Sequence, residues 1–242
     1  MNQKVVMVDG SARKKNTFRV LQDIGQILKK RGFDAEILDL FAYDLKDCAG
    51  CETCVGHDGC SLADDMPVLM QKLAASDAVV FSSPVYMGGV TSKFKTFADR
   101  TNAWVHKPEM AGKPVLFVAT TAATGRKEIK RFFKTYAAGL GARRGDFVSR
   151  AGKKMNLPVR EQEMSHFLAL LEEDKAQYRP ALSEIIMFTV QKVMALKSKE
   201  NDRAYWEQKE WLDKPYYYPC RMHLGKRAFS KLMFGVLSKA MR

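Results

Sequence analysis

Short apolar runs alternate with segments of helical periodicity over the first 150 residues. The runs are rich in β-branched residues, as in buried parallel strands, and cover Lys4–Asp9, Ala35–Leu40, Asp77–Phe81, Pro114–Thr120 and, more weakly, Arg143–Val148. Between them, helical spacing covers Thr17–Lys30, Val68–Leu73 after the capping residues Asp64 and Asp65, Thr91–Trp104 and Lys127–Ala138. Alternating strands and helices predict βαβ units, whose right-handed crossovers place helices on both faces of one sheet. The expected fold class is therefore α/β, a doubly wound parallel sheet.

The pattern changes after residue 150. We expect a first domain over residues 1–150 and a helical C-terminal extension over residues 151–242. One helix follows Arg179-Pro180, a second fits Asp202–Leu212 and a last one fits Gly225–Met241, while the Pro-bounded aromatic segment Lys214–Cys220 is extended.

The last predicted helix is amphipathic and basic. Between Arg221 and Arg242 there is no acidic residue, and apolar residues recur at three- and four-residue spacing: Phe229, Leu232, Met233, Val236, Leu237, Ala240 and Met241. Such a helix can lie on an anionic membrane. A stripe of this kind more often packs on the protein's own core or on a partner subunit, which is the favoured interpretation.

Composition narrows the class of protein. Hydrophobic residues make up 46% of the 242 residues and charged residues 28%, which excludes a disordered chain. No apolar run reaches the ~20 residues of a transmembrane helix, and the N-terminus lacks a signal-peptide layout, so we expect a cytoplasmic protein. The net charge of +13 suits nucleic acid, an anionic membrane, a phosphate cofactor or an acidic partner. No nucleic-acid-binding framework accompanies it, so nucleic acid is not an expected partner.

The segment Gly10–Thr17 connects the first predicted strand to the first helix. At this place in an α/β sheet, free backbone amides and the helix dipole favour anions. Ser11, Asn16 and Thr17 supply neutral donors and Arg13 supplies charge. The alternative interpretation is a solvated basic turn with a capping residue.

Two further loops flank the same edge of a doubly wound sheet. The segment after the third strand contains Pro84, Val85, Tyr86, Met87 and Gly88; its proline stiffens the turn and Gly88-Gly89 allows close backbone approach to a flat ligand. Ala119–Gly125, with Thr120 and Thr121, forms a small, polar third wall. The alternative for the segment after the third strand is an ordinary βα turn.

Four of the five cysteines lie in one loop, residues 48–60. Cys48, Cys51, Cys54 and Cys60 are spaced C-x₂-C-x₂-C-x₅-C among small residues such as Gly56. Four thiolates meet the requirement of a [4Fe–4S] cluster. Redox or empty thiols and a zinc site are the alternatives, although zinc usually draws two separated knuckles. We interpret His57 as a surface histidine and Cys220 as a free, inert thiol.

These segments together resemble the flavodoxin-like NAD(P)H-dependent FMN reductases, especially the iron–sulfur flavoproteins. Gly10–Thr17 is similar to the family's phosphate loop, with Ala12 where proline is usual. Ser83–Tyr86 and Lys93–Arg100 match its second signature, and the cysteine spacing followed by Asp64-Asp65-Met66 matches its cluster motif. The resemblance covers about residues 1–145. It implies a flavodoxin-like sheet of order 2-1-3-4-5, FMN with its phosphate at Ser11, Arg13, Asn16 and Thr17, and its ring against Pro84–Gly88.

The resemblance implies an FMN-dependent oxidoreductase that passes electrons between a [4Fe–4S] cluster, FMN and an external donor or acceptor. Because the cofactors carry the chemistry, no side chain is expected to be an acid or base. NAD(P)H or a ferredoxin-type protein is the expected electron donor. The alternatives are a cluster-free NAD(P)H-dependent FMN or quinone reductase and a basic, metal-stabilised binding module.

Two surface features bear on partners. The fourth predicted helical region has several basic residues: Arg126, Lys127, Lys130, Arg131 and Lys134. They form either a solvated helix face, the favoured interpretation, or a docking patch for an acidic electron donor or the phosphates of NADPH. We also expect a homo-oligomer, dimer or tetramer. The extension offers apolar stripes and aromatic residues that can cover a flavin of a neighbouring chain: Trp206, Trp211, Tyr216, Tyr217 and Tyr218.

Overall fold

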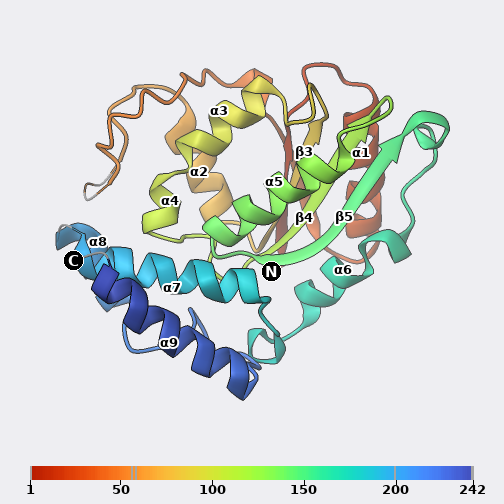
Figure 1. Ribbon diagram of the computed structural model, residues 1–242. Coiled ribbons are helices and arrows are strands. Elements are labelled where there is room, and N and C mark those ends of the chain that lie inside the picture. Colours follow the sequence, from red (N-terminus) through yellow and green to blue (C-terminus); the bar gives the residue numbers. More distant parts are fainter. Residues whose placement is uncertain (1, 56, 58, 199, 241–242) are drawn as a thin grey trace.

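The computed structural model describes residues 2–55, 57, 59–198 and 200–240, so Gly56, Met241 and Arg242 of the predicted features lie outside the described residues. Its centre is one five-stranded sheet in the order β2-β1-β3-β4-β5, with all neighbouring strands parallel (Figure 1). The strands are β1 (Lys4–Asp9), β2 (Asp34–Asp39), β3 (Ala78–Pro84), β4 (Pro114–Thr121) and β5 (Arg143–Ala151). The predicted doubly wound sheet of order 2-1-3-4-5 is confirmed.

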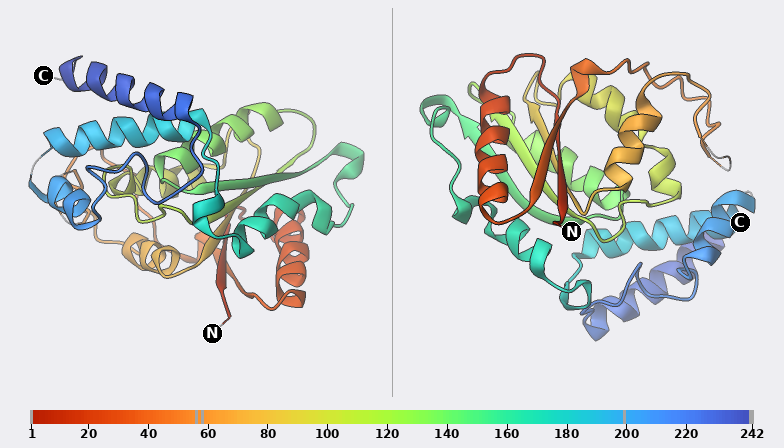
Figure 2. Two further views of the ribbon diagram at one scale, coloured as in Figure 1. Left: turned by 90° about the horizontal axis from the view of Figure 1, so that it is seen from below. Right: turned by 180° about the vertical axis from the view of Figure 1, so that it is seen from behind.

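Helices cover both faces of the sheet, because successive strand residues point to opposite sides. Val6 and Val8 of β1 face a core with α2 (Met66–Ala74), α3 (Ser92–Arg100) and α5 (Arg126–Gly139). Val5 and Met7 face α1 (Asn16–Lys30) and α6 (Ser165–Glu172) on the other side (Figure 2). The apolar runs of β1, β3 and β4 are therefore continuous, because these central strands are buried on both faces.

Several element boundaries differ from prediction: β5 continues to Ala151 instead of ending at Val148, and the helix expected over Asp202–Leu212 ends at Gln208. Two further differences lie near the predicted loops. β3 was expected to end at Phe81, but it continues through Ser82, Ser83 and Pro84. The hydroxyls donate to the carbonyls of Val8 and Pro84 at 2.8 Å, so these polar residues are satisfied inside the sheet. The helix expected over Thr91–Trp104 is divided in two: α3 ends at Arg100, just before Thr101, and the short α4 (Ala103–His106) follows.

The C-terminal extension is helical, as predicted, with α7 (Leu182–Lys197), α8 (Glu200–Gln208) and α9 (Leu224–Ala240). However, α6 places Phe167 and Leu168 in the core beside β1 and β4. α6, which follows residue 150, thus packs on the sheet of the predicted first domain.

The extension has a core of its own along the amino-terminal edge of the sheet (Figure 1). Trp206 is fully buried and donates its indole N–H to the His106 carbonyl at 2.8 Å. Gln191 donates to the carbonyls of Val105 and Gly139, which joins α7 to α4 and α5. The expectation that the extension's aromatic residues offer cover to a neighbouring chain is wrong for Trp206, Trp211, Tyr216 and Tyr217, which are buried in this core. Among the described residues, no helix is both long and apolar enough to cross a bilayer.

Candidate functional site

The three predicted loops meet at the carboxyl edge of the sheet, where the helices that follow the paired strands β1 and β3 lie on opposite faces. Direct contacts join them. The Thr17 and Thr120 hydroxyls lie 2.7 Å apart and buried, and the Val85 amide donates to the Thr120 carbonyl at 2.8 Å. Arg13 donates to the Tyr86 hydroxyl at 3.2 Å. Residues of all three predicted loops thus contact one another, so the loops form a single site.

The first loop is shaped to receive an anion. α1 begins at Asn16, and its N-cap residue, Lys15, has no side-chain oxygen to accept a hydrogen bond from the first turn. The amides of this turn and the positive end of the helix dipole are therefore available to a ligand. Arg13 and Asn16 are exposed, whereas Ser11 is buried and donates to the Arg13 carbonyl at 3.0 Å. Ser11 thus shapes the loop from within while Arg13 and Asn16 face solvent.

A buried carboxylate supports the loop from below. Asp9 accepts hydrogen bonds from the Ser11 amide at 3.0 Å and from Lys14 at 3.1 Å, and Lys14 also pairs with Asp39 at 2.6 Å. Burial raises the pKa of Asp9, although Lys14 and Ser11 oppose the shift. Lys14 is therefore turned back to carboxylates, which leaves Arg13 as the loop's cation closest to the second loop.

The second loop is a tight turn that exposes its tip. Tyr86 and Gly89 exchange backbone hydrogen bonds of 3.0 and 2.9 Å. Met87 at the tip has φ +49° and is fully exposed, and Gly88 follows with φ +78°. Positive φ favours glycine, so Met87 holds a conformation that side chains seldom adopt. An exposed thioether and the half-exposed Tyr86 ring offer soft, flat surface to an aromatic ligand.

The third loop packs under the second. Gly125 has φ +87°, and a Cβ there would lie 2.5 Å from the Val85 Cγ1 atom. Glycine is thus required for the two loops to approach each other. Thr121 is buried and donates to the Thr124 carbonyl at 2.6 Å. In the described structure, Thr120 and Thr121 thus lie in the wall that the third loop contributes to the site.

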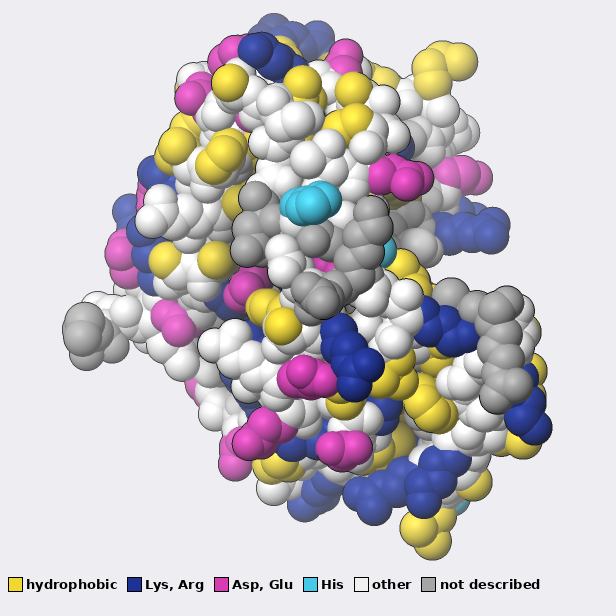
Figure 3. Space-filling model, turned by 90° about the vertical axis from the view of Figure 1, so that its left-hand side faces the viewer, with side chains coloured by type: hydrophobic (Ala, Val, Ile, Leu, Met, Phe, Trp, Pro, Cys, Tyr) yellow, Lys and Arg dark blue, Asp and Glu magenta, His cyan; other side chains and the backbone are white. Residues whose placement is uncertain are grey.

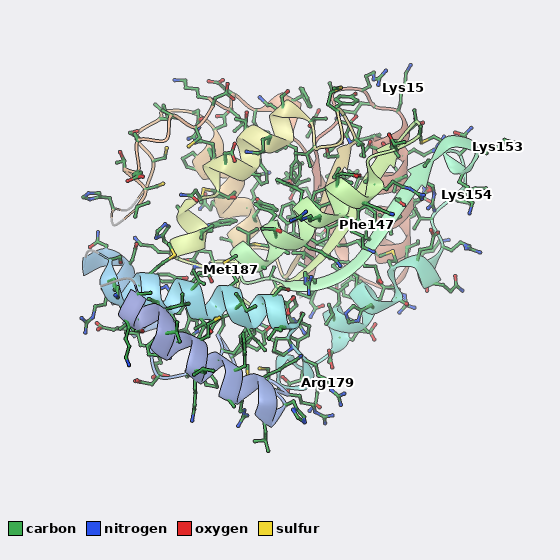
Figure 4. The ribbon with its side chains drawn as sticks, in the orientation of Figure 1. Lys15, Phe147, Lys153, Lys154, Arg179 and Met187 are labelled. Carbon is green, nitrogen blue, oxygen red and sulfur yellow. The ribbon has the colours of Figure 1, made fainter. Side chains whose placement is uncertain are left out.

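Two neighbours of the site were not predicted. The Thr91 hydroxyl donates to the Gly10 carbonyl at 2.7 Å, and the Thr91 amide donates to the Ser83 hydroxyl oxygen at 3.0 Å, so Thr91 joins the first two loops. The turn after β5 also approaches, since Arg19 of α1 donates to the Met155 carbonyl at 2.6 Å. Lys153 and Lys154 in that turn lie at the same edge as Lys15 (Figure 4). Their only sequence signal was a pair of lysines just past a predicted strand.

The cysteine loop is closed at its base by a buried ion pair. Arg100 of α3 donates to both carboxylate oxygens of Asp64 and to the Lys46 carbonyl, the last at 2.8 Å. The Lys46 amide in turn donates to Asp64 at 2.9 Å. Desolvation acts to raise the pKa of Asp64, but hydrogen bonds from Arg100, Lys46 and Met66 together lower it. Residues on both sides of the cysteines are thus bound to one arginine.

The thiols themselves are accessible. Cys48, Cys51 and Cys60 are exposed and Cys54 is half-buried, and His57 is exposed as expected. Hydrogen bonds from Ser61 and Thr53 lower the pKa of Cys51 to about 7, whereas burial raises the pKa of Cys54. Within the part of the chain that the structure describes, no three His, Cys, Asp or Glu side chains are grouped closely enough to hold one metal ion. The donor set suits a cluster chemically. The loop conformation described does not gather it.

A model of the NADPH-dependent FMN reductase family matches residues 3–143, more than half of the chain. The chain belongs to this family. The match contains all three loops and the cysteine segment, and it supports the resemblance inferred from the motifs.

Curated relatives of this FMN reductase family member are named iron–sulfur flavoproteins. One from Archaeoglobus fulgidus is 28% identical over 226 residues, which cover 86% of this chain and 100% of the relative. One from Clostridioides difficile is 29% identical, covering 84% of this chain and 97% of the relative. A second A. fulgidus protein is 39% identical over 98 residues, 40% of this chain. The chain spans about half the length of that relative and of several others it matches.

Solved structures agree on the fold. RosB with bound 8-demethyl-8-formylriboflavin-5′-phosphate has a TM-score of 0.55 at 12% identity, covering 90% of this chain and 83% of RosB. A flavone reductase has a TM-score of 0.55 at 15% identity, covering 74% of this chain and 68% of that protein. At these identities the likeness establishes the flavodoxin-like fold alone.

Proposed function

We propose that this chain is an FMN-dependent oxidoreductase of the iron–sulfur flavoprotein type, which passes electrons between FMN, a [4Fe–4S] cluster and an external donor or acceptor. The observation that carries the flavin assignment is the junction of three loops at the carboxyl edge of the sheet. An exposed Arg13 and the open start of α1 lie there beside the Tyr86–Gly88 turn.

The residues present fit FMN. The first turn of α1, with Arg13 and Asn16, would hold the phosphate, since amides and a guanidinium are strong donors to phosphate oxygens. The turn Pro84–Gly88 would support the ring, because its backbone is pinned at both ends and its tip is open. When bound, FMN supplies hydride and electron transfer. The protein's part is to orient it and to set its access to solvent and partners.

The cluster rests on the four-thiol spacing and on the names of the relatives. Cys48, Cys51, Cys54 and Cys60 would hold it, and the loop would have to close around it, because the described thiols are not gathered. The anchored base, Arg100 with Asp64, would limit that movement to the residues between the anchors.

The external donor would approach along α5. Arg126 and Lys127 begin this helix directly after Gly125, whose neighbours include Val85 of the flavin loop. The helix continues with exposed Lys130, Arg131 and Lys134. A positive surface that starts at the site would attract an acidic ferredoxin-type protein or the phosphates of NAD(P)H.

Anaerobic purification tests both cofactor assignments. We expect FMN at one molecule per chain, together with iron and inorganic sulfide in the ratio of a [4Fe–4S] cluster and a broad absorption beneath the flavin bands. Protein that neither retains nor takes up FMN contradicts the proposal.

The ungrouped thiols favour a second candidate, a cluster-free NAD(P)H-dependent FMN or quinone reductase. Stoichiometric FMN without iron and sulfide, with NAD(P)H oxidation supported by added flavin or quinone, would establish it. Anaerobic reduction by NADH, NADPH or reduced ferredoxin, compared by the rate of flavin bleaching, identifies the donor.

A further inference from the structure

Helix α9 packs on the protein with a side that is partly polar and partly apolar, since Ser230 is buried and Lys226, Met233, Phe234, Leu237 and Ser238 are half-buried. Residues at four-residue intervals, Lys226, Ser230, Phe234 and Ser238, form one line along the helix. Ser230 is the residue of α9 that is buried, and its hydroxyl lies 3.0 Å from that of Thr189 on α7. The apolar residues of α9 are therefore divided between the inward and the outward side, whereas an ordinary surface helix buries its apolar stripe.

The other contacts on this line are two hydrogen bonds and one cation–π contact. Lys226 donates to the Pro180 carbonyl at 2.7 Å, and Lys197 of α7 donates to the Ser238 carbonyl at 3.0 Å. The Phe234 ring is covered by the Lys192 ammonium at 5.2 Å from its centre. These contacts fix the rotation of α9, so its opposite side faces outward.

The outward side of α9 is apolar. Leu224, Leu232 and Val236 are 78%, 70% and 58% exposed, and Phe229 is 39% exposed. Ala228 completes the line, so four of these residues follow at four-residue intervals on the side opposite Ser230. α9 is the outermost helix of the extension, beyond α7 as seen from the sheet (Figure 2). A flat surface can therefore reach the whole line.

Cations surround this apolar line. Arg227, Lys231 and Lys239 are exposed on the same helix, and no acidic residue occurs from Arg221 to Arg242. Seen from the side where α9 ends, hydrophobic side chains lie beside Lys and Arg at the lower right (Figure 3). A groove of about 680 Å³ lies between α7 and α9 and is also mainly cationic. One acidic residue, Asp213, lines it together with four basic ones: Lys192, Lys214, Arg227 and Lys231.

We infer that the outward face of α9 docks on an anionic lipid bilayer, with the apolar line inserted between headgroups and the cations on their phosphates. Charge complementarity selects this occupant. A two-fold contact between two copies would bring Arg227 and Lys231 of each toward those of the other, with no acid on 221–240 to pair them. A basic helix with exposed Leu, Val and Phe has the composition of interfacial membrane helices.

This inference goes beyond the proposed function and does not depend on it. α9 lies at the edge of the molecule opposite the loop that contains Lys15 (Figure 4). A docked molecule would therefore keep the flavin loops and the basic face of α5 open to partners in solution.

Vesicle flotation with the full-length protein tests the inference. We expect the protein to float with vesicles of equal parts phosphatidylcholine and phosphatidylglycerol, and not with phosphatidylcholine alone. The variant Leu232→Glu/Val236→Glu should bind about ten-fold less, since it removes two inserted side chains and adds charge of the wrong sign. Arg227→Glu/Lys231→Glu should lose the preference for the anionic lipid.

Matched controls separate this outcome from misfolding and self-association. Val68→Glu places the same change on an exposed valine of α2, and Lys29→Glu reverses a charge at the end of α1; both should float like the parent. All variants should retain the parent's melting temperature and molar mass. Failure to bind anionic vesicles, or equal binding by Leu232→Glu/Val236→Glu, overturns the inference. Conversion of a dimer to a monomer by that variant would instead assign α9 to contact with a second copy.

Discussion

At the scale of single residues, the site depends on a few side chains that join segments distant in the sequence. Arg13 reaches Tyr86, Thr17 reaches Thr120, and Thr91 reaches Gly10. Of these, Arg13 is exposed while Thr17 and Thr120 are buried against each other. We therefore expect Arg13 to act on the ligand directly and the threonine pair to act by holding the loops.

Arg13→Ala combined with Asn16→Ala should weaken FMN binding about ten- to hundred-fold, because a charge-assisted hydrogen bond contributes about 1.5–3 kcal/mol. Titration followed by flavin fluorescence measures the dissociation constant. Lys30→Ala, at the far end of α1, is the control and should bind FMN like the parent. An unchanged constant in the double variant would move the phosphate away from this loop.

Arg100→Met should lower the free energy of unfolding by about 3 kcal/mol, because it leaves the Asp64 carboxylate buried without its partner. Lys95→Met breaks an exposed pair with Asp99 and should cost about 0.5 kcal/mol or less. Urea denaturation measures both. A loss for Arg100→Met no larger than that of the control would show that the pair does not anchor the loop.

The same pair predicts a pH dependence. The pKa of Asp64 is lowered from 3.8 in the folded state, so its ionised form stabilises the fold above that value. This contribution disappears as the pH falls through the lower, folded-state pKa. The stability difference between the parent and Arg100→Met should therefore narrow in acid well below pH 3.8. A difference that stays constant between neutral pH and acid contradicts this assignment.

At the scale of elements, loops carry the site and the sheet positions them. β3 and β4 are paired as far as Pro84 and Thr120, which brings the second and third loops side by side. The cysteine loop is separate, since its base is attached to α3 through Arg100. The flavin loops and the cysteine loop should therefore respond independently to substitution.

Replacing Cys48, Cys51, Cys54 or Cys60 by Ala should lower the iron content while FMN stays bound. Cys220→Ala is the matched control, because this fifth cysteine lies in the extension and packs beside its core. Iron, sulfide and flavin assays on anaerobic protein give the three readouts. Zinc at one per chain without sulfide would replace the cluster by a structural metal.

At the scale of the molecule, two packed units share the chain. The α/β unit includes α6, and the extension has its own aromatic core around Phe188 and Trp206. Gln191 and Trp206 connect them through hydrogen bonds to α4 and α5. The extension therefore covers the amino-terminal edge of the sheet, away from the flavin loops.

Phe167→Ala in α6 should cost about 3–5 kcal/mol, because the ring is fully buried against the sheet. Phe229→Ala on the outward side of α9 should cost far less. Chemical denaturation decides whether α6 belongs to the central unit. Similar, small losses of unfolding free energy in both variants would show that α6 lies outside the central unit.

Homo-oligomer formation stays a prediction at this scale. Light scattering on the full-length protein should give the mass of a dimer or tetramer, since a flavin at the sheet edge gains cover from a neighbouring chain. A monomer at all concentrations contradicts it. The cover would have to come from elements other than the aromatic core of the extension, which is already buried.

The sequence by itself determined the alternation of strands and helices, the three loops and the thiol spacing, whereas the strand order was predicted from the family resemblance. Each of the first three features depends on a local signal: a β-branched run, a polar turn before a helix, or cysteines a fixed number of residues apart. Packing decided the rest, because it depends on residues far apart in the chain. Ser82 and Ser83 continue β3 since their hydroxyls find carbonyls, and α6 joins the sheet since Val148 and Leu116 leave an apolar face to cover. The rotation of α9 follows from Ser230 meeting Thr189, which periodicity along one helix cannot specify.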